Sequence, residues 1–138
     1  MINIFIIITL IILSGIFKGF MDALRFHYSQ SFFINFKNEQ FWNPNISWLN
    51  KYNSVLYNDG IKFPKFFGST TFFVWLTDGW HLLQMIYLNL LFLAMGMAFT
   101  NRFILITNDF YSIIIMTLIF SVLFKTAFEV SYNLSYKK

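Results

Sequence analysis

Residues 71–90 read TFFVWLTDGWHLLQMIYLNL, and this stretch decides how the rest of the chain is interpreted. It is mostly apolar and has about the 20 residues that a helix needs to cross a bilayer. It nevertheless contains an ionisable pair, Asp78 and His81. An ionisable side chain at membrane depth costs about 3 kcal/mol or more unless it is paired, hydrated or turned toward the interior of a helix bundle. We therefore expect the pair to be either a functional site or a polar anchor.

The composition is that of an integral membrane protein with a single domain. Of the 138 residues, 57% are hydrophobic and only 12% are charged, whereas about 25% of the residues in soluble domains are charged. The chain has no cysteine, which excludes disulfides, thiolate metal ligands and cysteine nucleophiles. Its 10 basic residues are spread among apolar segments. That distribution argues against nucleic-acid binding, which needs a basic face.

We predict an all-α integral membrane protein with three transmembrane helices and a long interfacial loop between the first and the second. The apolar runs and turn residues place helix one over about residues 2–29, the loop over about 30–68, helix two over about 70–99 and helix three over about 110–130. Two interpretations of helix two are open. We favour a helix that begins in the interface, and the alternative is a break at Gly79 after a short re-entrant piece. The short connection predicts that helices two and three are antiparallel neighbours.

The predicted loop combines turn signals with amphipathic aromatic residues. Asn43-Pro44 and Pro64 prevent a spanning helix there. Aromatic rings of this kind gather at headgroup level, and here they are Trp42, Trp48, Tyr52 and Tyr57. We expect this loop to lie on the membrane surface, and the alternative is a structured cap over a site.

The distribution of basic residues predicts the orientation in the membrane. Six lie between Lys18 and Lys65, and the C-terminal part has three, at Lys125, Lys137 and Lys138. The connection between helices two and three has only Arg102. Lysine and arginine collect on the cytoplasmic side. We therefore expect the N-terminus outside and the C-terminus in the cytoplasm, in a bacterial inner membrane.

This topology brings the ionisable residues of all three helices to one level. All three helices would cross the same cytoplasmic boundary. Helix one would leave the bilayer at Lys18 and Asp22, helix two would enter it at Asp78 and His81, and helix three would leave it at Lys125 and Glu129. Charged groups collected at one depth are expected to contact one another or to line a polar pocket.

Asp78 and His81 are three residues apart and share one face of a helix. Such a pair can ligate a divalent metal ion, act as a carboxylate–imidazole base, or form a purely structural network. The candidate catalytic residues are Asp78, His81 and Asp22. The candidate metal ligands are Asp78, His81, His27 and Glu129. The candidate residues for a lipid phosphate or another anion are Lys18, Arg25, Lys51 and Lys125.

Three function hypotheses follow, and the sequence contains no hydrolase or nucleotide-binding motif that would decide between them. The first is a polar site at the cytoplasmic boundary that binds a metal ion or a lipid phosphate. The second is a non-enzymatic accessory subunit that packs against a membrane-protein partner or forms a homo-oligomer. The third is a holin-type protein that permeabilises the membrane.

Three pieces of the chain carry a resemblance. They read Lys18…Asp22…Phe26-His27, Trp42-Asn43-Pro44…Ser47-Trp48…Asn50-Lys51-Tyr52 and Leu76-Thr77-Asp78…Trp80-His81. In these the chain resembles a group of small, uncharacterised bacterial and phage integral membrane proteins. The resemblance implies that the loop and the start of helix two form one functional unit, and it implies no activity. Leu49 departs from the polar or basic residue expected between Trp48 and Asn50.

Overall fold

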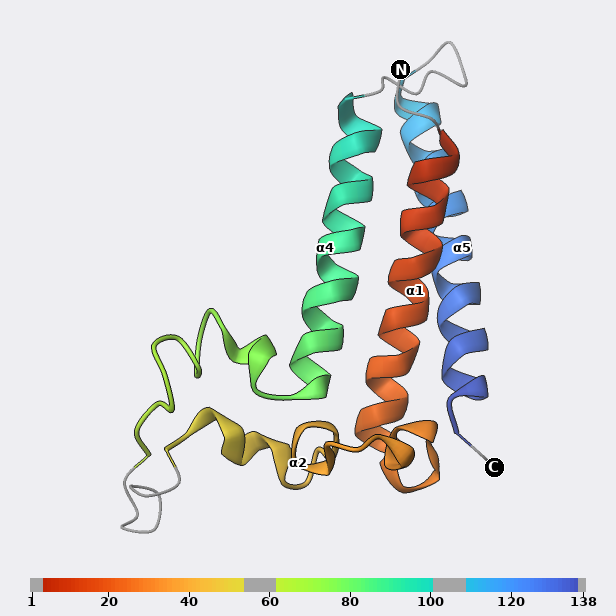
Figure 1. The fold of residues 1–138 in the computed structure, drawn as a ribbon. Helices are drawn as coiled ribbons and strands as arrows, with labels where there is room; N and C mark the ends of the chain where they lie inside the picture. The colour runs from red at the N-terminus through yellow and green to blue at the C-terminus, as the bar shows by residue number, and fades with distance from the viewer. Residues whose placement is uncertain (1–3, 54–61, 101–108, 137–138) are drawn as a thin grey trace.

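The computed structural model describes residues 4–53, 62–100 and 109–136. These residues form three long α-helices, α1 (Ile4–Phe26), α4 (Gly79–Thr100) and α5 (Asp109–Leu134) (Figure 1). All three are long and apolar enough to cross a membrane. The predicted all-α integral membrane fold with three transmembrane helices is confirmed.

Helix α1 lies between the other two long helices and packs against both (Figure 1). It runs in the same direction as α5 and opposite to α4. The end of α1, the start of α4 and the end of α5 therefore meet at one end of the bundle, beside the α1–α4 connection, and we call this the loop end. The predicted meeting of these helix ends is confirmed. The prediction that helices two and three are direct neighbours is wrong, because α1 occupies the place between them.

Small residues make the contact between α1 and α5. Gly15, Gly19 and Ala23 are buried on α1 and follow one another at four-residue intervals, so they form one stripe. A Cβ on Gly15 would lie 3.0 Å from the Cβ of Ala127, and one on Gly19 would overlap the Oγ of Ser131. Lipid tails are as apolar as leucine, so helices in a bilayer associate through close packing of this kind.

Two clusters of buried apolar side chains hold the bundle together along α1 and α4. The cluster far from the loop end is Ile7, Ile11 and Ala94, and the cluster at the loop end is Met21, Leu24, Phe33 and Leu83. Between the clusters the buried hydroxyl of Ser14 donates to the backbone carbonyl of Tyr87 over 2.8 Å. The polar atom between the helices is thereby satisfied within the protein, as the bilayer requires.

The connection between α1 and α4 is folded against the loop end. Its described part contains η1 (Tyr28–Gln30), η2 (Phe32–Asn35), α2 (Glu39–Trp42), η3 (Ser47–Lys51) and η4 (Val74–Leu76). The backbone N–H of Phe32 donates to the carbonyl of Ser135 at the end of α5 over 3.1 Å. The Trp42 indole lies against Gly79, where an added Cβ would come within 2.7 Å of the ring. The described part of the long loop is therefore structured and packs on the loop end of the bundle, and its place on the membrane surface stays a prediction.

Helix boundaries differ from the predicted ones at three points. Helix α1 ends at Phe26, not near residue 29, and α5 continues to Leu134, beyond the predicted end near residue 130. The favoured start of helix two near residue 70 is wrong, because α4 begins at Gly79. Before it the chain makes a turn in which Gly68 has a φ of 80° and its carbonyl accepts from the N–H of Phe73 over 2.9 Å. A left-handed residue does not continue an α-helix. Four residues named in the sequence-based predictions lie outside the described part, namely Tyr57, Arg102, Lys137 and Lys138.

Substitution of Gly19 by alanine is expected to lower the free energy of unfolding by about 1–3 kcal/mol, the usual cost of overpacking. The new methyl group would overlap Ser131 and approach the carbonyl oxygen of Phe128 to 2.7 Å. Circular dichroism of the purified protein during titration of mixed micelles with SDS measures this change.

The matched control is Gly96→Ala, because no atom lies within 4 Å of a Cβ added there. It is expected to be neutral or to stabilise the protein by up to about 1 kcal/mol, since alanine restricts the unfolded chain more than glycine does. Equal stability of the two variants would contradict the close packing of α1 on α5.

Candidate functional site

Asp78 caps the N-terminus of α4. Its carboxylate accepts the backbone N–H of His81 over 2.9 Å, and its carbonyl accepts the first helical bond, from the N–H of Leu82, over 3.1 Å. Aspartate is among the preferred N-cap residues because it satisfies a helix donor that has no partner within the helix. With only 3% of its surface exposed, Asp78 is a buried acid held in place by the helix that it starts.

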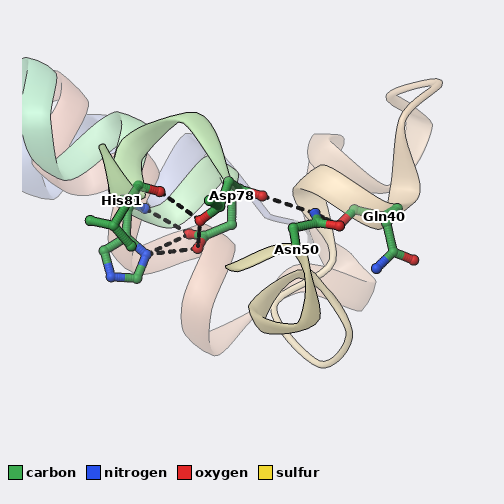
Figure 2. A network of polar contacts seen from close by, with 6 residues as sticks. Gln40, Asn50, Asp78 and His81 are labelled. Carbon is green, nitrogen blue, oxygen red and sulfur yellow. Dashed lines mark hydrogen bonds and ion pairs between the residues drawn. The ribbon is translucent and has the colours of Figure 1, made fainter. Parts of the chain in front are cut away.

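The imidazole of His81 contacts the same carboxylate. Its Nδ1 lies 2.8 Å from each oxygen of Asp78. The hydroxyl of Thr77 donates to the carbonyl of Val74 over 2.6 Å and lies 3.2 Å from Oδ2 of Asp78. Figure 2 shows the second ring nitrogen pointing away from the carboxylate. This Nε2 has no hydrogen-bond partner among the described residues, and 21% of the His81 side-chain surface is exposed. The predicted Asp78–His81 pair is therefore formed, with one nitrogen unused.

The environment of Asp78 keeps its carboxyl group ionised. Burial alone raises its pKa, but the hydrogen bonds from the ring and the backbone N–H of His81, together with the charges of His81 and Lys51, bring the pKa below its ordinary value of 3.8. An ionised Asp78 accepts a hydrogen bond from the Nδ1–H of His81 and so selects the tautomer in which Nδ1 carries the proton. Nε2 is then a lone-pair acceptor when the ring is neutral and an N–H donor when it is protonated.

The loop is tied to this site by a side-chain amide. The Nδ2 of Asn50 donates to the carbonyl of Thr77 over 2.9 Å and to the carbonyl of Gln40 over 2.8 Å (Figure 2). Next to it the hydroxyl of Ser69 donates to the carbonyl of Lys51 over 2.7 Å. These bonds cross from η3 to the residues that precede α4 and hold Lys51 close enough for its charge to act on Asp78.

The other predicted acids and imidazole form contacts elsewhere. Asp22 pairs with Lys18 one turn away on α1. His27 Nε2 lies 2.7 Å from the hydroxyl of Tyr132 on α5, and its ring stacks on Tyr136 with a centroid distance of 3.9 Å. Within the described ranges no three His, Asp or Glu side chains come together in a way that could hold a metal ion. Asp22, His27 and Glu129 therefore do not complete a metal site with Asp78 and His81.

Two of the four predicted anion-binding cations lie near the pair. Lys51 acts on Asp78, and the Arg25 guanidinium lies 5.3 Å from the ring centroid of Trp80, the neighbour of His81. Lys18 is paired with Asp22. Lys125 is exposed on α5 and, in the described structure, forms no ion pair with Glu129 despite the favourable spacing. Of these four residues, Lys51 is the one whose charge acts on Asp78.

Several residues of the site were not singled out from the sequence. In the sequence Asn50 is one residue of a loop motif, and its contacts with Thr77 and Gln40 join segments far apart in the chain. Tyr132, the partner of His27, gave no signal, because a tyrosine in an apolar helix is most simply a core residue. The sequence indicates Gly79 as a helix break, and the structure shows that its missing side chain also makes room for Trp42.

The Asp78→Asn variant is expected to be less stable at neutral pH by about 1–3 kcal/mol, the usual worth of a hydrogen bond to a charged group. The pKa of Asp78 is lowered in the folded protein, so its contribution is fully present above its ordinary value of 3.8 and is lost as pH falls through the folded value. The asparagine variant should lack this acid-dependent component. Thermal unfolding in detergent across the acid range measures it, with the exposed Glu39→Gln as control. If the wild type and Asp78→Asn lose the same stability as the pH falls, the carboxylate does not make the hydrogen bonds described.

The Asn50→Ala variant is expected to release the loop from the start of α4. The carbonyls of Thr77 and Gln40 would each lose a donor, at a cost of about 1–3 kcal/mol for a group left unsatisfied. Limited proteolysis of the loop in nanodiscs should accelerate. The control is Asn35→Ala, since Asn35 is exposed and its side chain has no hydrogen bond to another described residue. Equal cleavage rates for both variants would argue against the bridging role of Asn50.

Comparison with protein-family models, curated proteins and solved structures finds no match to this chain. The resemblance to small bacterial and phage membrane proteins therefore stays a prediction. The function of the protein rests on the geometry of the Asp78–His81 site and its surroundings.

Proposed function

We propose that this small polytopic membrane protein binds a phosphate group, of the kind carried by anionic lipids, at the Asp78–His81 site. The observation that carries the proposal is the orientation of His81: the carboxylate fixes Nδ1, and Nε2 has no partner among the described residues. Nε2 carries an N–H when the ring is protonated, and such a charged donor makes a strong hydrogen bond to a phosphate oxygen.

The charges around the pair support an anionic ligand. The charge of Lys51 acts on Asp78, and the Arg25 guanidinium lies against Trp80, the neighbour of His81 in the chain. The buried carboxylate is screened from a ligand by the ring that lies on it, because both of its oxygens face Nδ1. An anion approaching Nε2 therefore meets the cationic side of the site.

Binding is better supported than catalysis or metal ligation. In the described structure the pair has no third carboxylate or imidazole beside it. No hydroxyl of the described residues is bonded to Nε2 to serve as a nucleophile, whereas a nucleophile–base bond is what marks nucleophilic catalysis. A single oriented donor with nearby cations is sufficient for a phosphate.

The proposal includes the orientation of the protein. Six basic residues between Lys18 and Lys65 favour placing the loop end in the cytoplasm, with the N-terminus outside, in a bacterial inner membrane. The cytoplasmic leaflet carries anionic lipids that attract basic segments next to the membrane. A phosphate site at the loop end would then face the leaflet that supplies its ligand.

His81→Gln is expected to weaken phosphate binding about tenfold or more, which corresponds to about 1.4 kcal/mol. Calorimetric titration of the detergent-purified protein with inorganic phosphate and with short-chain phosphatidylglycerol measures this loss for both sources of the group.

The control is His27→Gln, because the His27 ring is engaged by Tyr132 and lies outside the site. Its affinities should equal those of the wild type. Stronger binding of the lipid than of inorganic phosphate would identify a headgroup as the ligand, and the reverse order would identify a soluble phosphate. Unchanged affinity of His81→Gln for both probes would refute the proposal.

A further inference from the structure

A phenylalanine-rich turn lies directly before α4, and we call its residues 66–76 the phenylalanine turn. Phe67 and Phe72 are the two most exposed large apolar side chains among the described residues, with 90% and 86% of their surface accessible. Three further apolar side chains of the turn are exposed, those of Phe66, Phe73 and Leu76. Exposed apolar side chains gathered in this way mark a surface that contacts a membrane or another protein.

The turn has a fixed shape because its backbone is tied to itself and to η3. Gly68, with a φ of 80°, has a carbonyl that accepts the N–H of Phe73 over 2.9 Å. The buried hydroxyl of Ser69 accepts the N–H of Lys65 over 3.1 Å and donates to the carbonyl of Lys51 over 2.7 Å. These bonds hold the turn in place, so its phenylalanine side chains are presented to the outside by folded backbone.

The turn projects toward the depth at which α4 crosses the membrane. Helix α4 has 22 residues, about 33 Å at 1.5 Å per residue, which is close to the roughly 30 Å of the hydrocarbon core. Its first residue, Gly79, therefore lies near the boundary of that core. Figure 1 shows the chain before α4 leaving the loop end sideways and rising above the level at which α4 begins, in the direction that α4 follows. The projecting part of the turn thus reaches the boundary of the core.

The residues at the base of the turn are of the kind found at headgroup level. The base pairs with the end of η3, where the N–H of Lys65 donates to the carbonyl of Lys51 over 2.9 Å. The ammonium of Lys62 lies 5.7 Å from the ring centroids of Trp48 and Tyr52. Tryptophan and tyrosine rings gather at headgroup level, and basic segments next to an anionic leaflet are attracted to it. From base to turn the side chains therefore change from headgroup type to hydrocarbon type, in the order in which a leaflet changes.

We propose that the phenylalanine turn inserts Phe67 and Phe72 into the leaflet at the loop end, as an interfacial anchor beside the three spans. A membrane is favoured over a protein partner because the turn is attached to a spanning helix and its side chains follow the polarity of a leaflet. Insertion of this kind places apolar side chains about 5–10 Å into the boundary between headgroups and acyl chains. The anchor is independent of the phosphate site, since its depth is measured without a phosphate ligand.

Spin labels on single cysteines measure the depth of the turn, because the chain has no cysteine of its own. Phe67→Cys and Phe72→Cys carry a nitroxide in nanodiscs of phosphatidylglycerol and phosphatidylcholine. Electron paramagnetic resonance compares the collisions of the nitroxide with oxygen, which concentrates in lipid, and with a nickel chelate, which stays in water. Two reference positions define the scale: Phe92→Cys, 61% exposed on α4, and Glu39→Cys, exposed on α2 outside the bundle. The ratio of oxygen to nickel collisions at both turn positions should be shifted from the value at Glu39 toward the value at Phe92.

Removal of one ring tests whether the phenylalanines hold the turn in the leaflet. Adding Phe72→Ser to labelled Phe67→Cys should shift the collision ratio toward the value at Glu39. The control Phe5→Ser, at a phenylalanine that is 71% exposed near the other end of the bundle, should leave the ratio unchanged. Circular dichroism verifies that all variants fold.

A collision ratio at Phe67 and Phe72 equal to that at Glu39 would overturn the proposal. Few collisions with either reagent would overturn it as well, because they would place the turn under a partner protein or a second copy of the chain. An unchanged ratio after Phe72→Ser would overturn the anchoring role of that ring.

Discussion

The buried carboxylate of Asp78 is the constraint on which the loop end depends. A charge that is only 3% exposed must be matched by donors, because an unmatched buried charge is among the costliest features in a protein. Here the donors are the backbone N–H and the ring of His81. Meeting this requirement fixes three things together: α4 begins at the next residue, His81 turns its ring back along the helix, and the Thr77 carbonyl is left free to receive Asn50 from the loop.

The packing of α1 explains why the bundle has a groove on one side. Toward α5 the helix presents Gly15 and Gly19, so the two backbones come close. Larger side chains stand at the margin of this contact, among them Ile16 on α1 and Val130 on α5. The small residues let the two backbones come close, and the large side chains beside this contact line the two sides of the groove. The close contact that joins α1 to α5 is thus bordered by an apolar groove of about 600 Å³.

The sequence was sufficient for the class, the number of spans and the level of the ionisable groups, since these follow from composition, length and alternating direction. It was insufficient for the start of α4, because the phenylalanines before Gly79 continue the apolar run whether the chain forms a helix or a turn. The Asp78–His81 pair was predictable from its spacing, but the Asn50 contact joins residues 27 positions apart and has no local signal. The four-residue spacing of Gly15 and Gly19 is typical of closely packed membrane helices, and the composition of the chain does not reveal it.

The ionisable groups that meet at one level do not merge into one site, and the reason is the thickness of α1. A helix with its side chains is about 10–12 Å across, so groups on opposite sides of it are closer to local partners than to one another. Lys18 therefore pairs with Asp22 along α1, and His27 turns to Tyr132 on α5. Of the two histidines in the chain, His27 has its Nε2 engaged, and His81 alone keeps an Nε2 without a partner in the described structure. The division of partners around α1 is thus what isolates His81 as the group available to a ligand.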